Sequence, residues 1–506
     1  MNIFANRLIR PGMMILLCAA MLLLSLGCQS EHDGGGEAVT PAHAETPGSD
    51  AINAGNGDNN GGTPEETVII ADNVPDFNFG GADFVIGGIE NPNFSTVHVV
   101  EELTGELMND AIYARTIYIE ERFNVNLVEF FVWDSYAPGR WTREVNAGDF
   151  TFHMYTMRID HALPFWLNGT MIPWDAIPYI DLEQPWWNQS INEFLTINDA
   201  QPMVIGAFNI STYDLAFALL FNQQIVADLN LPVPYGLVRD GTWTMDAMLG
   251  MMREFTQDVT GDGTMGENDH FGYVAHPKMV VPNFTIGAGE FMIRKDAQDL
   301  PYLAMTGERF LRAWERVYEM MWDGGHWWSN MPLDADVPSA GINMFQEGRA
   351  LFMDTSFFEI ERLRAMETDF GILPYPKLDT YQERFYARIS YYVPTIVPIT
   401  NTQLEKTGAL FEALNAKSYR TVLPTYLDTI LMVRNIRDEE SAEMLDLMFN
   451  SFVVDIGDTS MCVIIRDSFV AQMFSANDRR FVSTLERNER RIQRELDRMI
   501  ERALEH

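Results

Sequence analysis

The stretch AGINMFQEGRALF, residues 340–352, changes its structural pattern halfway along. Residues 340–347 are helical in pattern, Gly348 is a residue type that ends helices, and residues 349–354 return as an apolar strand. The later stretch DFGILPYPK, residues 369–377, is a second strand that leaves its sheet through a turn with two prolines. Helix, glycine, strand and proline turn in this order predict an α/β domain.

The preceding part of the chain shows the same alternation of strands and helices. Residues 83–89 and 125–132 are strand candidates, and a helical pattern lies between them. Strand, helix and strand in succession indicate a parallel α/β unit. A further strand is predicted at residues 150–157, and two buried strands are predicted at residues 203–208 and 215–222.

The C-terminal half contains longer helical patterns. Thr244 can cap a helix that carries apolar residues on its inner face, and a second strong helix covers residues 306–322. Three more helices are expected at residues 402–416, 441–452 and 477–504. The last of them is heavily charged and has only a thin apolar stripe, so it is expected to pack on the outside of the body.

The N-terminus carries a secretion signal. Arg7 and Arg10 precede an apolar run of roughly 14 residues that ends in LSLGC, residues 24–28, and such a run is too short for a membrane-spanning helix. This ending resembles the lipobox of bacterial lipoproteins, in which Cys28 is acylated, for example with palmitate, and becomes the first mature residue. The alternative is an ordinary signal peptide with an incidental cysteine. Residues 28–66 are rich in Gly, Asn, Pro, Thr and acids, which predicts a flexible tether.

Composition allows a large folded body and excludes several partners. Of the 506 residues, 47% are hydrophobic, which suffices for two or three domains. Loss of Arg7 and Arg10 with the signal leaves 33 basic and 72 acidic residues, a formal charge of 33 − 72 = −39. Such a charge argues against nucleic acid and against direct electrostatic docking on anionic lipid. Cys462 is the one mature cysteine besides Cys28, so no intramolecular disulfide is expected and Cys462 is predicted to lie in the core.

Three stretches together resemble the extracellular solute-binding proteins of bacterial carbohydrate-type ABC importers, the group that includes maltose-binding protein. They are residues 340–352, residues 369–377, and the acidic loop with Asp262-Gly263 ahead of Phe271-Gly272-Tyr273. The resemblance covers about residues 82–455 and implies a two-lobed, periplasmic-binding-protein-like α/β fold with solute bound in a cleft between the lobes. It also implies chain crossings near residues 211–220, near residues 391–395 and near Leu423, and a membrane permease as partner.

The predicted organisation has four parts. They are a lipoprotein signal peptide at residues 1–27, the acylated cysteine and tether at residues 28–66, lobe 1 at residues 67–213 and 394–424, and lobe 2 at residues 214–393 and 425–506.

The candidate ligand contacts are polar and aromatic, because sugars present flat apolar faces and a rim of hydroxyls. The resemblance implies that Asp160 matches a polar ligand of the first lobe, and that Phe357 stands where maltose-binding protein has a stacking tryptophan. The candidates are Asp160, Trp174, Tyr213, Asp214, Trp243, Trp327, Trp328, Asp354, Phe357 and Tyr392. The alternative for each tryptophan in a loop is that it seals a hydrophobic cluster.

An acidic loop has the spacing of a calcium site. Asp258, Thr260, Asp262, Thr264 and Asp269 occupy positions 1, 3, 5, 7 and 12 of an EF-hand-type loop, with Gly263 at the turn. Asp269 replaces the usual glutamate at position 12, which weakens bidentate closure around a cation. Structural Ca2+ binding is one interpretation of this loop, and a solvated acidic turn is the other.

The sequence contains no catalytic motif of the common hydrolase, metalloprotease or phosphate-loop types. We therefore expect a receptor, not an enzyme, without an organic cofactor. It is expected to be a monomer, lipid-anchored at the extracellular face of the cell membrane, which captures a carbohydrate such as an oligosaccharide and delivers it to an ABC permease. A sugar or peptide receptor that feeds a sensor kinase and a polysaccharide hydrolase are the two alternatives.

Overall fold

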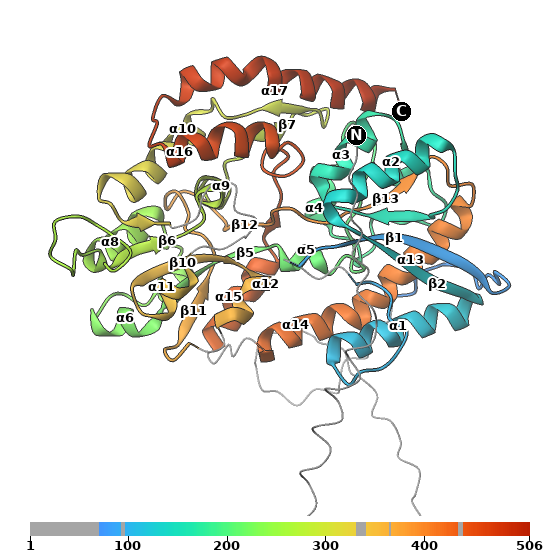
Figure 1. The fold of residues 1–506 in the computed structure, drawn as a ribbon, viewed down its shortest axis with the longest axis horizontal. Coiled ribbons are helices and arrows are strands. Elements are labelled where there is room, and N and C mark those ends of the chain that lie inside the picture. Colours follow the sequence, from blue (N-terminus) through green and yellow to red (C-terminus); the bar gives the residue numbers. More distant parts are fainter. Residues whose placement is uncertain (1–69, 93–96, 330–340, 364–365, 434–438, 506) are drawn as a thin grey trace, which may run out of the picture. The chain divides into compact units, whose positions relative to one another are not determined.

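Two five-stranded mixed sheets carry the fold (Figure 1). The computed structural model describes residues 70–92, 97–329, 341–363, 366–433 and 439–505, all within the unit Asn56–His506. The predicted signal peptide, Cys28 and the tether up to residue 66 lie outside the described residues.

The first sheet has the strand order β2-β1-β3-β13-β4. Strands β1 (Ala82–Glu90), β2 (Val125–Trp133) and β3 (Met154–Thr156) are parallel, and they are connected by helices α1 (Leu107–Phe123) and α2 (Ala137–Ala147). This confirms the predicted parallel unit. A Cβ atom at Gly87 of β1 would lie 2.5 Å from the Tyr155 ring of β3, so only glycine allows this close approach.

The chain returns to the first sheet from its second half. Strand β13 (Thr395–Pro398) runs antiparallel to both β3 and β4 (Met171–Ile172). Helices α13 (Leu404–Arg420) and α14 (Val422–Val433) follow it, and α14 packs against α1 and α13. Leu423, near which a third crossing is predicted, lies inside α14. The predicted lobe limits at residues 213, 393 and 424 stay predictions.

The second sheet has the order β11-β5-β10-β6-β9. Its strands are β5 (Phe217–Asn222), β6 (Phe271–Val274), β9 (Trp327–Trp328), β10 (Ala350–Ser356) and β11 (Phe370–Leu373). All six residues of β5 and all seven of β10 are buried, because helices cover both faces of these strands. The helices of this lobe are α6 (Gln223–Asp228), α7 (Pro234–Arg239), α8 (Met245–Phe255), α9 (Pro277–Gly287), α10 (Glu308–Tyr318), α11 (Ile342–Gln346), α12 (Phe357–Ile360), α15 (Glu439–Phe449) and α16 (Ala471–Ser475).

Residues 341–352, the described part of the stretch at residues 340–352, fold as their pattern predicts. Helix α11 ends before Gly348, whose φ of +72° is a left-handed conformation that favours glycine, and β10 follows directly. The remaining elements are short. They are α3 (Ile159–Leu167), α4 (Gln189–Leu195), α5 (Ser211–Asp214), the pairs β7 (Ile293–Lys295) with β8 (Pro301–Leu303) and β12 (Ala387–Arg388) with β14 (Phe452–Val453), the turns η1 (Asp134–Tyr136), η2 (Trp174–Ala176) and η4 (Glu361–Leu363), and the π-helical segments η3 (Glu319–Asp323) and η5 (Val463–Val470).

The predicted strand at residues 203–208 is wrong. This segment is buried, but it forms only isolated bridges and no strand. Its backbone is satisfied by single pairings, of Val204 with Thr395 and of Gly206 with Trp187, and by buried side-chain amides. Asn192 accepts from the Ile205 N–H at 2.8 Å, and Asn415 accepts from the Phe208 N–H at 3.0 Å. An apolar run predicts burial, but the partner that satisfies its backbone depends on tertiary contacts.

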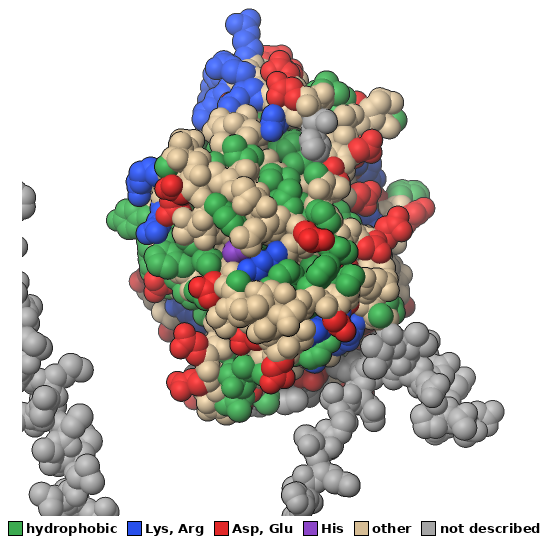
Figure 2. Space-filling view, turned by 90° about the vertical axis from the view of Figure 1, so that its right-hand side faces the viewer, with side chains coloured by type: hydrophobic (Ala, Val, Ile, Leu, Met, Phe, Trp, Pro, Cys, Tyr) green, Lys and Arg blue, Asp and Glu red, His purple; other side chains and the backbone are tan. Residues whose placement is uncertain are grey.

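The last helix, α17 (Phe481–Leu504), has the predicted thin apolar stripe. Its buried residues are Phe481, Leu485, Ile492, Leu496, Met499 and Ala503. Within the described residues, no helix is long and apolar enough to cross a bilayer, and this includes α17. Figure 2 views the molecule from the side of β1 and β2, and basic side chains gather at the top of this view, where α17 ends in Figure 1.

Candidate ligand-binding site

Two chain segments that connect the lobes lie side by side. The segment before β5 and the segment before β13 pair through the bridge Ala216↔Ile389, and the Ser390 N–H donates to the Leu215 carbonyl at 3.1 Å. These positions agree with the first two predicted crossings. Any rearrangement of one lobe against the other must pass through this pair of segments.

The crossing segment also holds the start of α3 in the first lobe. The Met157 N–H donates to the Pro394 carbonyl at 3.3 Å, and the Ile159 N–H donates to the Tyr392 carbonyl at 3.0 Å. Residues 157–161 directly follow the carboxyl end of β3. Ligands of open α/β sheets bind at the carboxyl ends of strands, so this is the place to look for a site.

Arg158 organises the polar groups at this strand end. Its guanidinium donates to both carboxylate oxygens of Asp160, at 3.0 and 2.6 Å, and to Asp134 at 3.2 Å. His161 Nδ1 lies 3.3 Å from the other oxygen of Asp134. Burial raises the pKa of Asp134, but the polar contact with His161 and the charge of Arg158 outweigh burial and lower it overall. Asp134 is therefore ionised at neutral pH.

An aromatic ring joins this group to the second lobe. The guanidinium carbon of Arg158 lies 4.7 Å from the centre of the Tyr391 ring, and that of Arg466 lies 4.3 Å from it. Arg466 belongs to η5, is fully buried, and donates from Nε to Asp467 at 2.8 Å. Burial lowers the pKa of Arg466 to about 10, which leaves it charged at neutral pH.

We call this group the Tyr391 cluster; its members are Asp134, Arg158, Asp160, His161, Tyr391, Arg466 and Asp467. Five of its members, Arg158, Asp160, His161, Tyr391 and Asp467, are partly exposed. Carboxylates and guanidinium groups beside an aromatic ring can accept and donate hydrogen bonds to neighbouring hydroxyls. The cluster therefore has the chemistry of a site for a polyhydroxylated ligand.

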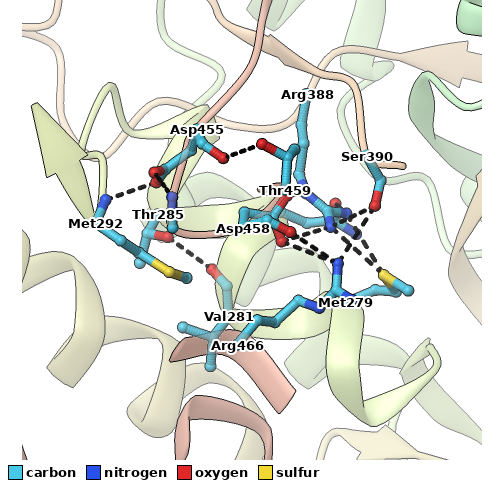
Figure 3. A network of polar contacts seen from close by, with 12 residues as sticks. Met279, Val281, Thr285, Met292, Arg388, Ser390, Asp455, Asp458, Thr459 and Arg466 are labelled. Carbon is cyan, nitrogen blue, oxygen red and sulfur yellow. Dashed lines mark hydrogen bonds and ion pairs between the residues drawn. The ribbon is translucent and has the colours of Figure 1, made fainter. Parts of the chain in front are cut away.

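A buried ionic network supports the cluster from the second lobe (Figure 3). Arg388 donates to both oxygens of Asp458, at 2.7 and 2.9 Å, and both residues are fully buried. Arg466 also donates to Asp458, with its carbonyl at 3.0 Å and its carboxylate at 3.3 Å. Burial raises the pKa of Asp458, and Arg388 opposes this. Because Arg388 and Ser390 directly precede Tyr391, the network fixes the crossing segment at its base.

The network extends under β10. Arg388 donates to Asn283 at 2.8 Å, and Asn283 donates to Asp354 at 3.1 Å and to the Tyr375 hydroxyl at 2.8 Å. Burial raises the pKa of Asp354 well above its usual range, against the opposing charge of Arg388. Asp354 is thus a buried partner of Asn283, and it is fully enclosed.

Of the ten predicted contact residues, the structure brings Asp160 into the cluster. Trp174 and Trp243 are fully buried and donate from Nε1 to backbone carbonyls, of Thr395 at 2.9 Å and of Pro374 at 3.0 Å. Phe357 is fully buried against aromatic rings of the second lobe, and Tyr392 is fully buried beside the exposed part of the crossing segment. In this structure these side chains pack the core.

The other predicted contacts lie apart from the cluster. Tyr213 is buried against Tyr426, and Asp214 accepts a hydrogen bond from the Tyr426 hydroxyl at 2.7 Å. Trp327 and Trp328 are half-buried in β9, where Trp327 packs on Phe474. Tyr213 and Asp214 thus stabilise the contact between α5 and α14, and the β9 tryptophans stabilise the edge of the second sheet.

Sequence reasoning did not select Arg158, Tyr391 or Arg466. Arg158 had one signal, since it stands two positions before Asp160. Arg466 had none, because its segment reads as an ordinary buried run and only the tertiary fold places it over Tyr391. Cys462 is buried, as predicted, and burial raises the pKa of its thiol well above its usual range.

The acidic loop binds its own backbone. Asp258 accepts from the Gly261 and Gly263 N–H groups at 2.7 and 2.8 Å, and Asp262 accepts from the Thr264 N–H at 2.8 Å. The hydroxyl of Thr264 lowers the pKa of Asp262. In the part of the chain that the structure describes, the acidic, histidine and cysteine side chains, as they are placed, form no group of three that could hold a metal ion, so a cation at this loop would have to replace these backbone bonds.

The comparisons with known proteins bear on the fold. No model of a known protein family matches the chain, and no curated protein is similar to it. Many solved structures do match, although their sequences are distant. The sugar-binding protein MalE from Xanthomonas citri matches with a TM-score of 0.56 and 11% identity, over 83% of this chain and 98% of that chain. The cyclic alpha-maltosyl-1,6-maltose binding protein from Arthrobacter globiformis matches with a TM-score of 0.54 and 13% identity, over 82% and 99%.

The GacH receptor of Streptomyces glaucescens, solved unliganded and in complex with acarbose, matches with a TM-score of 0.53 and 11% identity, over 82% of this chain and 99% of that chain. At such identities the likeness establishes the fold. The chain has the two-lobed, periplasmic-binding-protein-like α/β fold of these sugar-binding proteins.

Proposed function

We propose that this chain is an extracellular receptor that captures a carbohydrate at the Tyr391 cluster and delivers it to an ABC permease. The observation that carries the proposal is the placement of Arg158, Asp160 and Tyr391 at the carboxyl end of β3, beside both crossing segments. In a fold shared with sugar-binding proteins, this position couples a ligand contact to the relative movement of the lobes.

The charges of the cluster favour a neutral ligand. Arg158 and Arg466, together with Lys278, which lies 3.9 Å from Asp467, supply three positive charges. Asp134, Asp160 and Asp467 supply three negative ones. Because these formal charges cancel, a neutral oligosaccharide is a better fit than a uronic acid or another anionic sugar.

The sequence supports the location of the receptor. A secretion signal that ends in LSLGC, followed by a polar tether, suits a mature chain that is acylated at Cys28 and held at the extracellular face of the membrane. The replacement Cys28→Ser should release the receptor from the membrane fraction and abolish incorporation of labelled palmitate. Retention of both would contradict the anchor.

The binding proposal can be tested with the mature chain that begins at position 28 and carries Cys28→Ser. We would measure binding of maltotriose, maltotetraose, a cyclic maltodextrin and a uronic-acid oligosaccharide by calorimetry and thermal shift. A ligand that binds only the folded state at a hundredfold over its dissociation constant adds about 2.7 kcal/mol of stability. The neutral sugars are expected to bind and the uronic-acid sugar is not.

Two tyrosine variants, one in the cluster and one on the exposed surface, test whether the ligand binds at Tyr391. Tyr391→Ala removes the ring between the two arginines and should weaken binding at least tenfold, whereas Tyr381→Ala, at a position that is 89% exposed, should leave it unchanged. If the two variants bind the sugar with equal affinity, the ligand does not bind at Tyr391. Binding of peptides and of no sugar would overturn the carbohydrate assignment itself.

We also propose that the loop at residues 258–269 takes a structural Ca2+ ion. The support is the spacing of Asp258, Thr260, Asp262, Thr264 and Asp269, with left-handed glycines at 261 and 263 that shape the loop. Added Ca2+ should raise the melting temperature of the native chain and of the exposed control Asp149→Asn, and should have no effect on Asp262→Asn. A rise that persists in Asp262→Asn would place the ion elsewhere, and no rise in the native chain would leave a solvated turn.

A further inference from the structure

The C-terminal helix α17 contacts both lobes. At its start, the Phe481 ring packs on Trp314 at 4.3 Å and on Phe310 at 5.9 Å, both in α10 of the second lobe. Near its end, the Arg502 guanidinium lies 5.2 Å from the ring of Trp166 in α3 of the first lobe. Helix α17 also contacts β8 and α3. Figure 1 shows the helix passing over β7 toward α3.

The far end of α17 is fitted to the first lobe. Leu496, Met499 and Ala503 are at most 2% exposed, so the apolar face stays covered to the last turn. Gly169 follows α3, and a Cβ atom there would lie 3.1 Å from the Arg502 guanidinium. Arg502 thus occupies the space that a side chain at position 169 would need, so α17 is closely packed against the first lobe here.

The position of α17 relative to the crossing segments means that its contact with both lobes opposes their separation. In Figure 1, α17 lies at the top of the view, whereas α14 and α15, which flank the third connection between the lobes, lie at the bottom. A hinge that opens about the crossing segments separates the lobes most on the side away from them. Such a motion must pull α17 away from one of the two lobes.

We propose that α17 is a strap that holds the lobes together, and that its last turns must leave α3 before the lobes open. The start of the helix is anchored by the aromatic contacts of Phe481, and the end rests on a few apolar residues and Arg502. The weaker attachment is therefore the one to the first lobe. The strap sets how often the receptor opens, whatever ligand it takes.

The test measures the distance between the lobes without any ligand. Spin labels are placed at Tyr136→Cys in the first lobe and Tyr381→Cys in the second, at positions 72% and 89% exposed, in the mature Cys28→Ser chain. Cys462 is buried and stays unlabelled. Distance distributions from pulsed electron resonance are then compared between this chain, Arg502→Glu, a control Arg491→Glu on the exposed face of α17, and a chain that ends at Arg491.

Arg502→Glu and the shortened chain should add a population at longer distance, larger for the shortened chain, while Arg491→Glu should match the parent. If the shortened chain does not fold, Arg502→Glu alone decides, because its side chain is partly exposed and its loss leaves the apolar stripe intact. A distribution for Arg502→Glu that equals that of Arg491→Glu overturns the strap. This outcome leaves the sugar-binding proposal untouched, since no sugar is present.

Discussion

The guanidinium of Arg158 lies 4.7 Å from the ring of Tyr391, and this contact joins the start of α3 in the first lobe to a segment that crosses into the second. Arg466 contacts the same ring from η5. A residue of the crossing segment is thus held by one cation from each lobe. The geometry of the cluster therefore depends on how the two lobes are placed.

Replacement of Arg158 should weaken both binding and stability. Arg158→Met leaves the carboxylates of Asp134 and Asp160 without their shared cation, which should cost about 1–3 kcal/mol of stability and raise the pKa of Asp134. Calorimetry with the sugar that binds best and a thermal melt would measure both effects. Arg143→Met, an exposed arginine of α2, is the matched control. If the two variants behave alike, Arg158 has no organising role.

The pair formed by Arg388 and Asp458 should be costly to break. Arg388→Met removes the two shortest bonds to the buried Asp458 carboxylate and leaves it only the Arg466 contact at 3.3 Å, which should destabilise the fold by about 3–5 kcal/mol. The effect can be measured by urea unfolding at neutral pH. The control Arg239→Met breaks the surface pair with Glu443, in which the side chains are 44% and 49% exposed, and should cost much less because solvent screens this pair. Similar losses in both variants would show that burial does not control the strength of the pair.

Glu412 should make stability fall as pH rises. Burial raises the pKa of this carboxyl group to about 8, against the opposing hydrogen bonds from Asp181, Trp186 and Trp187, whereas the pKa of an unfolded glutamate is about 4.3. Between these two pKa values Glu412 holds a proton in the folded state and not in the unfolded state. Its contribution to the free energy of unfolding is therefore fully present below the unfolded-state pKa, and it is lost as pH rises through the folded-state pKa. Asp455, whose pKa burial raises to about 7, acts in the same direction.

The measurement is the melting temperature of the chain from pH 5 to pH 9. The native chain should lose stability over this range, and Glu412→Gln should show a flatter profile. The slope is the readout, because the introduced amide also places an N–H against the indole donors and changes the absolute stability. Glu486→Gln, at an exposed position of α17, should keep the native slope. A native slope in Glu412→Gln would exclude Glu412 as its source.

Trp243 should matter for folding and not for binding. Trp243→Phe keeps an aromatic ring in the core but loses the hydrogen bond to the Pro374 carbonyl, which should cost about 1–3 kcal/mol. Its affinity for the best sugar should equal that of the native chain. If the variant instead binds the sugar more weakly and its stability is unchanged, Trp243 contacts the ligand.

Much of the architecture could be predicted from local pattern. The stretch at residues 340–352 predicted helix, stop and strand, because glycine tolerates the left-handed conformation that the helix end needs and the apolar residues that follow prefer a buried strand. The parallel unit of β1, α1 and β2 could also be predicted, because the spacing of apolar residues differs between strands and helices. The segment at residues 203–208 forms no strand, because its backbone partners are single bridges to Thr395 and Trp187 and the side-chain amides of Asn192 and Asn415, which local pattern does not reveal.

The sequence by itself determined the alternation of helices and strands, the burial of Cys462 and the thin apolar stripe of α17, since periodicity and polarity are local properties of the chain. Only the tertiary structure decided which polar residues meet. Arg158 and Arg466 come to one ring from opposite halves of the chain, and Trp174 and Trp243, which stand in loops, are enclosed by distant elements. Contacts between residues that are far apart in the sequence depend on how the helices and strands pack, and the type of a residue does not predict which distant residues it will contact.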